Sequence, residues 1–238
     1  MRASLGYIKA ILLIALVAFL FGFAEKRQKS RKISEVAVKF TDTENLYVTE
    51  EAVNKLLIQN KVPSSGIGKE TLDLNRVEGL LNKHEMIENA EVYVTLDGKL
   101  EANVSQRKPI GRVVGNSSFY LDRNGELMPL SQYYSARVPL LMGFDGGNVK
   151  EVYPLLEYIR KDEFLTQHIT GITRVKPGRF NLQMRKMDFT VYMGDAENIE
   201  LKFNNFKAFY KKALKDDKLG AYRKVNLQFG NQVVCTKK

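Results

Sequence analysis

The sequence predicts an α+β protein in which a single N-terminal transmembrane helix precedes two folded domains. Three observations lead to this prediction. Residues 5–24 are a largely apolar run in which Lys9 is the one charge, residues 33–107 have the pattern strand, helix, helix and hairpin, and the remainder is rich in short strands. With 238 residues, 44% of them hydrophobic, the chain is long enough for two small domains after the apolar run.

The apolar run is just long enough to cross a membrane. Residues 10–24 alone make about 22 Å of helix, whereas residues 5–24 reach about 30 Å, the thickness of a hydrocarbon core. Gly22 and Ala24 keep a cleaved signal peptide open as an alternative, but the basic residues that follow favour a retained anchor. The predicted segments are a cytoplasmic tail over 1–9, the helix over 10–24, possibly 5–24, and a linker over 25–32.

The net charge of +10 is concentrated at the two ends of the chain. Residues 1–32 carry seven Lys and Arg against one Glu, residues 202–238 carry ten against two Asp, and the part between them has a net charge of −4. A nucleic-acid binder more often spreads its basic residues among stacking aromatic side chains. The pattern therefore predicts contacts with the lipid bilayer and with protein partners, and no nucleic acid.

The sequence contains no recognisable catalytic motif. A nucleophile elbow, a phosphate-binding glycine loop and an H-E-x-x-H pair are all absent. Cys235 is the one cysteine, which excludes an intramolecular disulfide, and the two histidines do not have the spacing of a zinc site. We therefore expect no enzyme activity, no cofactor, no metal and no small-molecule substrate.

The first folded region begins with an alternating strand over 33–40. Thr49 and Asp73 are predicted to cap helices over 50–59 and from Leu74 to about His84. A hairpin then joins two alternating runs, and a three-residue loop over Asp97–Lys99 would place Leu96 opposite Leu100. The alternation of the hairpin predicts that Val94 points into the core. The helical pattern predicts the same for Val77, Leu80 and Leu81.

The second region, residues 109–238, should be a strand-rich mixed α/β domain. A helix over 199–215 would bury one face and present a lysine stripe on the other, most simply a solvated face, with a partner or lipid contact as the alternative. The residues expected on its buried face are Ile199, Phe203, Phe206, Tyr210 and Leu214. The stripe consists of Lys207, Lys211, Lys215 and Lys218. The other predicted elements are strands over 112–114, 119–121, 172–175, 180–184 and 189–193 and a helix over 152–159, extended perhaps to 168.

Residues 33–108, with the order β-α-α-β-β, resemble a POTRA domain. The segments around the end of this domain match motifs of the bacterial cell-division family FtsQ/DivIB. The matching residues are Val104, Gln106, Arg107, Pro109 and Ile110, then Tyr120, Leu121, Asp122 and Gly125, then Val138 to Gly143. Gln106 departs from the family, which commonly has Glu there. The chain is therefore identified as a member, with an FtsQ-type β domain over 109–238.

This resemblance implies a non-catalytic, bitopic scaffold in the cell inner membrane that acts in septum formation. Its N-terminus would be cytoplasmic, its large domain periplasmic or extracytoplasmic, and its partners FtsB-like and FtsL-like division proteins. The excess of Lys and Arg after the apolar run opposes this topology, although long domains translocate with little regard to such charges. A POTRA-bearing chaperone for outer-membrane or secreted proteins and a membrane-anchored hydrolase remain alternatives.

The C-terminal segment is the candidate partner-binding site. Residues 222–229 alternate as a strand, Gly230 and Asn231 suggest a turn, and residues 233–235 return. In the resembling family the last strands accept a partner strand by β-augmentation, a backbone mechanism that tolerates Asn226 and Gln228 where the family has Asp and Arg. Alternatively, the strands are interior or are blunted by Lys237 and Lys238. The candidate residues are Tyr222, Val225, Leu227, Phe229, Gln232, Val233 and Val234.

Overall fold

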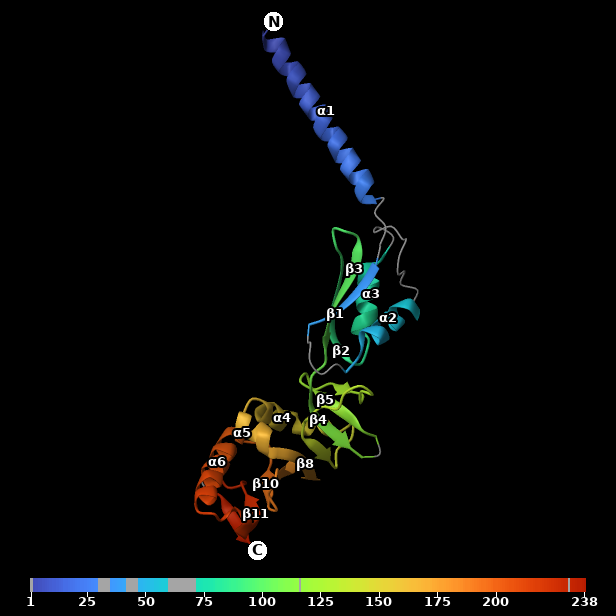
Figure 1. Ribbon diagram of the computed structural model, residues 1–238. Helices are drawn as coiled ribbons and strands as arrows, with labels where there is room; N and C mark the ends of the chain where they lie inside the picture. Colours follow the sequence, from blue (N-terminus) through green and yellow to red (C-terminus); the bar gives the residue numbers. More distant parts are fainter. Residues whose placement is uncertain (1, 30–34, 42–46, 60–71, 116, 231) are drawn as a thin grey trace. The chain divides into compact units, whose positions relative to one another are not determined.

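The computed structural model describes the whole chain except residues 1, 30–34, 42–46, 60–71, 116 and 231 (Figure 1). It divides into two compact units, Met1–Gln106 and Arg107–Lys238. The Pro, Ser and Gly residues over 63–68 predict a turn between the two helices, and this segment lies outside the described residues.

Helix α1, Arg2–Lys29, contains the whole predicted apolar run. Its large apolar side chains from Ile11 to Phe23 are exposed. The helix continues through Glu25–Lys29, where we expected a linker, because Glu, Lys, Arg and Gln are all good helix formers. In the part of the chain that the structure describes, no helix combines the length and the apolar character needed to cross a membrane, so the predicted spanning segment is not confirmed.

The rest of the first unit has the predicted order of strand, two helices and hairpin. Its elements are β1 Glu35–Phe40, α2 Glu50–Gln59, α3 Leu74–Asn82, β2 Ile87–Val94 and β3 Lys99–Gln106. The strands form a sheet in the order β1-β3-β2, in which β1 runs parallel to β3 and β2 antiparallel to it. Both predicted caps are present: Ala52 N donates to Thr49 Oγ1 at 3.2 Å and Arg76 N donates to Asp73 Oδ1 at 3.0 Å.

The hairpin between β2 and β3 has a three-residue loop, but its register differs from the prediction. Val94 pairs with Leu100, and Leu96, which we expected opposite Leu100, is at the tip and is 86% exposed. Gly98 determines this register, because its φ of 90° suits the left-handed loop position that other residues adopt at a cost. Thr95 Oγ1 also accepts the Lys99 N–H at 3.0 Å. The shift is two residues, so each side chain keeps its predicted face.

Two of the three residues that we predicted on the buried face of α3 are confirmed there, and the third is only partly buried. Val77 and Leu81 are buried, whereas Leu80 is half-buried at the edge of the helical stripe. Val94 is also half-buried, because it closes the hairpin at the end of the sheet. The helical repeat predicts the stripe correctly, but it does not predict that Leu80 is less buried than Leu81.

We therefore expect Leu81→Ala to lower the free energy of unfolding of this domain by about 2–5 kcal/mol, because it leaves a cavity in a packed core. Leu80→Ala is the matched control and should cost clearly less. Urea unfolding of residues 33–108, followed by circular dichroism, measures both changes. Equal losses in the two variants would contradict the observed orientation of α3.

The second unit is built on a large mixed sheet. Its strands are β4 Pro109–Val114, β5 Phe119–Asp122, β6 Leu127–Met128, β7 Leu140–Met142, β8 Ile169–Lys176, β9 Arg179–Met184, β10 Thr190–Gly194, β11 Tyr222–Asn226 and β12 Val234–Lys237. Its helices are α4 Tyr153–Arg160, α5 Glu163–His168 and α6 Ile199–Lys215, with short 3-10 turns over Val149–Val152 and Leu219–Ala221. Within the described residues the sheet order is β12-β11-β10-β9-β8-β7-β4-β5-β6.

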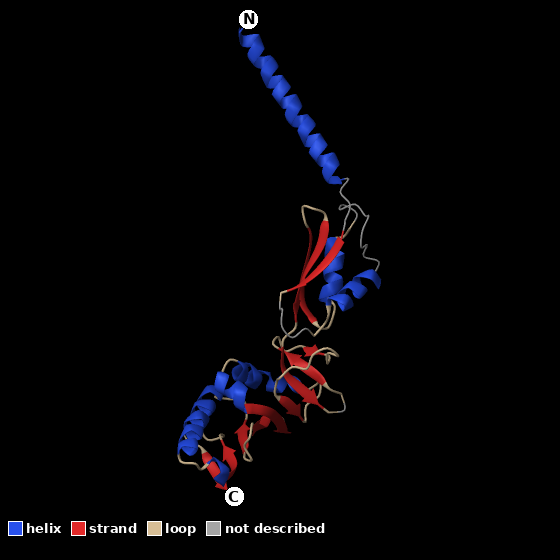
Figure 2. Cartoon of the chain, viewed as in Figure 1, coloured by secondary structure: helices blue, strands red, loops and turns tan. Residues whose placement is uncertain are grey.

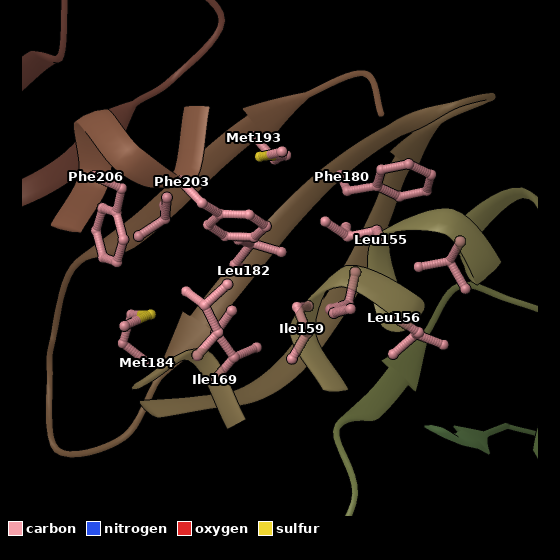
Figure 3. Packing of buried hydrophobic residues seen from close by; sticks show 14 of the residues in the cluster. Leu155, Leu156, Ile159, Ile169, Phe180, Leu182, Met184, Met193, Phe203 and Phe206 are labelled. Carbon is pink, nitrogen blue, oxygen red and sulfur yellow. The ribbon is translucent and has the colours of Figure 1, made fainter. Parts of the chain in front are cut away.

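One row of side chains defines the buried face of this sheet. Leu141, Ile172, Leu182, Val191 and Val225 are neighbours in register on β7, β8, β9, β10 and β11, and all are fully buried. Helices α4, α5 and α6 contribute to the same core. Figure 2 shows these helices beside the sheet, and Figure 3 shows side chains of α4, α6 and the strands meeting in the core.

Two helix predictions for this unit need correction. The helix that we allowed to run from 152 to 168 is divided, because Asp162 accepts the Leu165 N–H at 3.0 Å and caps a new helix. Helix α6 has the predicted bounds, but Leu214 is 59% exposed and Ala213 takes its place in the core. In the last turn of α6 the buried position is therefore one residue earlier than the predicted stripe places it.

Candidate functional site

The C-terminal strands form one end of the large sheet. Strand β11 lies between β10, to which it is parallel, and β12, to which it is antiparallel. Strand β12 is the last strand in the sheet order, and no described strand pairs with its other side. Strand β11 is thus interior and β12 is an edge, and the binding of a partner strand at that edge stays a prediction.

The register shows which backbone groups of β12 face away from β11. The Lys238 N–H donates to the Ala221 carbonyl at 3.0 Å, so the backbone of Lys238 faces β11. Because successive residues of an antiparallel strand point to alternate sides, the N–H and C=O groups of Cys235 and Lys237 face outward. Such a row of backbone donors and acceptors can pair with another extended chain.

The predicted site residues occupy three different environments. Val225 and Leu227 are buried in the core and are not accessible to a partner. Tyr222 and Val233 are partly buried and pack against that core. The exposed members are Phe229, Gln232 and Val234.

Strand β11 is also shorter than we predicted and ends at Asn226. The Asn226 side chain accepts the Gln228 N–H at 3.0 Å, an Asx-type turn that diverts the chain before Phe229. Asn231, in the expected turn, lies outside the described residues.

The connection from β11 to β12 contacts the first half of α6. The sequence did not indicate this contact. Asn205 Nδ2 donates to the Gly230 carbonyl at 2.9 Å, and Leu201 lies beside Gly230. Leu201, Phe229 and Val234 are between 41% and 44% exposed, so apolar side chains accompany the open backbone edge. Leu201 is an apolar residue outside the buried stripe of α6. This feature of the sequence could have identified Leu201 as part of the candidate site.

The basic residues of this region are not all available to a partner. Lys202 is buried and donates to Asp195 at 2.6 Å, and this hydrogen bond holds the pKa of the Asp195 carboxyl below its usual value. Lys207 of the predicted stripe pairs with Asp162. The stripe is therefore an exposed face only at Lys211, Lys215 and Lys218.

The chemistry of this end of the sheet suits binding better than catalysis. Burial raises the pKa of the Cys235 thiol, which keeps it in the unreactive protonated form. Among the described residues, no group of three or more His, Cys, Asp or Glu side chains is arranged to hold a metal ion. What the edge offers to another molecule is a backbone ladder, exposed apolar side chains and excess positive charge.

A second set of motif residues, far from this edge in sequence, stabilises the start of the domain. Arg107 Nη1 donates to Asp122 Oδ2 at 2.9 Å, and the Asp122 side chain is fully buried. The other carboxylate oxygen of Asp122 accepts the N–H groups of Asn124 at 2.9 Å and Glu126 at 2.8 Å. The Gly125 N–H also donates to the Asp122 carbonyl at 3.0 Å, so residues 122–125 form a turn, and these contacts join two motifs that the sequence presented separately.

Comparison with family models agrees with this architecture. A model described as POTRA-like domain matches residues 31–105, and one described as FtsQ/DivIB, C-terminal related, matches residues 108–236. A comparison with curated proteins gave no match. Fold and matches together define a division protein with a POTRA-like domain and a strand-rich C-terminal domain.

The second match covers more than half of the chain, which therefore belongs to the FtsQ/DivIB family. This family consists of non-catalytic cell-division proteins that interact with other division proteins.

Proposed function

We propose that this protein is a non-catalytic scaffold of the bacterial division machinery and that β12 holds a partner by strand addition. The observation that carries this proposal is the position of β12 as the last strand of the sheet, with the backbone of Cys235 and Lys237 facing outward. An added strand would complete those hydrogen bonds whatever the side chains are. The proposed partner is an FtsB-like or FtsL-like protein with an extended segment.

The surroundings of β12 indicate the character of that segment. Phe229, Val234 and Leu201 offer apolar contact next to the backbone ladder. Residues 202–238 carry ten Lys and Arg against two Asp, and three of these basic residues, Lys202, Lys207 and Lys238, are paired with Asp residues outside the segment. The remaining positive charge would still attract an acidic segment to this end of the domain. We therefore expect the partner strand to combine apolar residues with flanking Asp or Glu, and its association to slow as salt is added.

We further propose that α1 attaches the protein to the inner membrane, with the N-terminus in the cytoplasm and the domains outside it. The exposed apolar side chains from Ile11 to Phe23 support this proposal, since such a surface is stable in contact with lipid rather than water. Protease added to spheroplasts should digest the domains. If they resist digestion until the membrane is lysed, the topology is the reverse.

Depletion of the protein tests the proposed function. Loss of a division scaffold should give filamentous cells with unclosed septa, and the wild-type chain supplied in trans should restore septation. Normal septation together with loss of outer-membrane proteins would instead favour the POTRA-bearing chaperone. The membrane-anchored hydrolase would require a catalytic residue whose substitution reproduces the depletion without disturbing partner binding.

A further inference from the structure

The C-terminal unit contains a pocket of about 460 Å³ that is distinct from the β12 edge. It lies where β4 and β8 begin, between the C-terminal half of α4 and the residues that precede β7. Its volume is within the range of about 300–1,000 Å³ that is typical of small-molecule sites. Neither the fold nor the proposed division role accounts for an open space of this size.

The floor of the pocket is apolar. Ile110, Leu156, Ile159 and Ile169 are buried core residues that line it, and the last three appear in Figure 3. Thr166 is also in the lining, but its hydroxyl donates to the Ile159 carbonyl at 2.8 Å. The floor therefore favours an apolar group and provides little hydrogen bonding of its own.

Three arginines, Arg137, Arg160 and Arg185, are also among the lining residues. Arg185 Nε donates to the Gln167 carbonyl at 2.9 Å, and Arg160 is held by Glu157 through Nε and Nη2, both at 3.0 Å. These contacts orient Arg185 and Arg160 and leave other N–H groups of each without a partner among the described residues. Arg137 has no ion pair or side-chain hydrogen bond within that part of the chain, and no Asp or Glu lines the pocket.

We propose that this pocket binds a small amphipathic anion. Planar guanidinium forks match the paired oxygens of a phosphate or carboxylate, and the isoleucines and leucine receive an apolar body. Arg137 and Arg185 are the primary anion ligands, because the charge of Arg160 is already paired with the Glu157 carboxylate. The ligand needs both an anionic head and an apolar body. The apolar floor cannot bind the anionic head, and the arginines do not bind the apolar body.

Calorimetric titration of the full chain in a neutral detergent tests the proposal. Phenyl phosphate and phenylacetate are the probes, and they distinguish a phosphate head from a carboxylate head. Inorganic phosphate supplies the charge alone and benzyl alcohol the apolar body alone. We expect at least one probe to bind more tightly than both of these partial compounds.

Arg137→Gln combined with Arg185→Gln should weaken that binding by about tenfold to a hundredfold, because hydrogen bonds to a charged group are lost. The matched control is Lys218→Gln combined with Arg223→Gln, which removes the same charge from exposed positions elsewhere in the unit. Unchanged binding in the first variant, an equal loss in the second, or no preference of the wild type for either probe would overturn the proposal. None of these outcomes depends on whether depletion blocks septation.

Discussion

Arg107→Gln is expected to lower the free energy of unfolding of the C-terminal domain by about 3–5 kcal/mol, because it leaves the carboxylate of Asp122 buried without its positive partner. The Asp122 side chain is fully buried, and Arg107 contacts it at 2.9 Å. Urea unfolding of residues 107–238, followed by circular dichroism, measures the change.

Two further variants separate loss of the ion pair from a general effect of removing an arginine. Arg223→Gln removes an exposed arginine of the same domain and should change the free energy of unfolding by no more than about 0.5 kcal/mol. Asp122→Asn added to Arg107→Gln removes the buried charge while keeping an oxygen for the turn, and should recover part of the loss. If Arg107→Gln alone is neutral, the pair does not stabilise the domain.

Phe203→Ala is expected to cost a similar amount, about 3–5 kcal/mol, for a different reason. Phe203 is fully buried where α6 packs on the sheet, and its ring stacks on Tyr158 of α4 with centroids 5.4 Å apart. Figure 3 shows Phe203 in the core cluster that also contains Leu182 of β9. Truncation leaves a cavity among three elements at once, and the same urea unfolding experiment measures its cost.

Phe229→Ala is the matched control, because Phe229 is exposed beside the β12 edge. It should leave the free energy of unfolding almost unchanged. Comparable losses in the two variants would show that Phe229, and not only Phe203, belongs to the packed core, and the surface proposed for the partner would then have no accessible aromatic side chain.

Local patterns predicted much of the fold. The caps at Thr49 and Asp73, the bounds of α6 and the order of elements in the first domain follow from periodicity and capping chemistry, which act over a few residues. The corrections concern tertiary contacts. The hairpin register depends on the backbone conformation of Gly98, and the burial of Leu81 rather than Leu80 depends on how α3 meets its sheet.

The candidate site was predictable only in part. Alternation and family resemblance pointed to the last two strands, but not to which of them is the edge, because strand order is not a local property. The support from Leu201 and Asn205 joins segments about 25 residues apart. The pairing of Arg107 with Asp122 was missed for the same reason, since each residue was interpreted within its own short motif.

The most direct test of the account is co-purification of an FtsB-like or FtsL-like partner with edge variants of the full chain. Cys235→Pro combined with Lys237→Pro removes the two outward N–H donors, whereas Cys235→Ala combined with Lys237→Ala makes similar side-chain changes and keeps both donors. Lys237→Pro alone is a milder variant that leaves the partly buried Cys235 in place.

Partner capture from solubilised membranes is quantified for each variant, with circular dichroism confirming that it is folded. We expect the alanine pair to retain the partner, Lys237→Pro to weaken capture and the proline pair to lose it. Full retention by a folded proline pair would contradict strand addition at β12 and would move the binding surface elsewhere, first to the exposed lysines of α6.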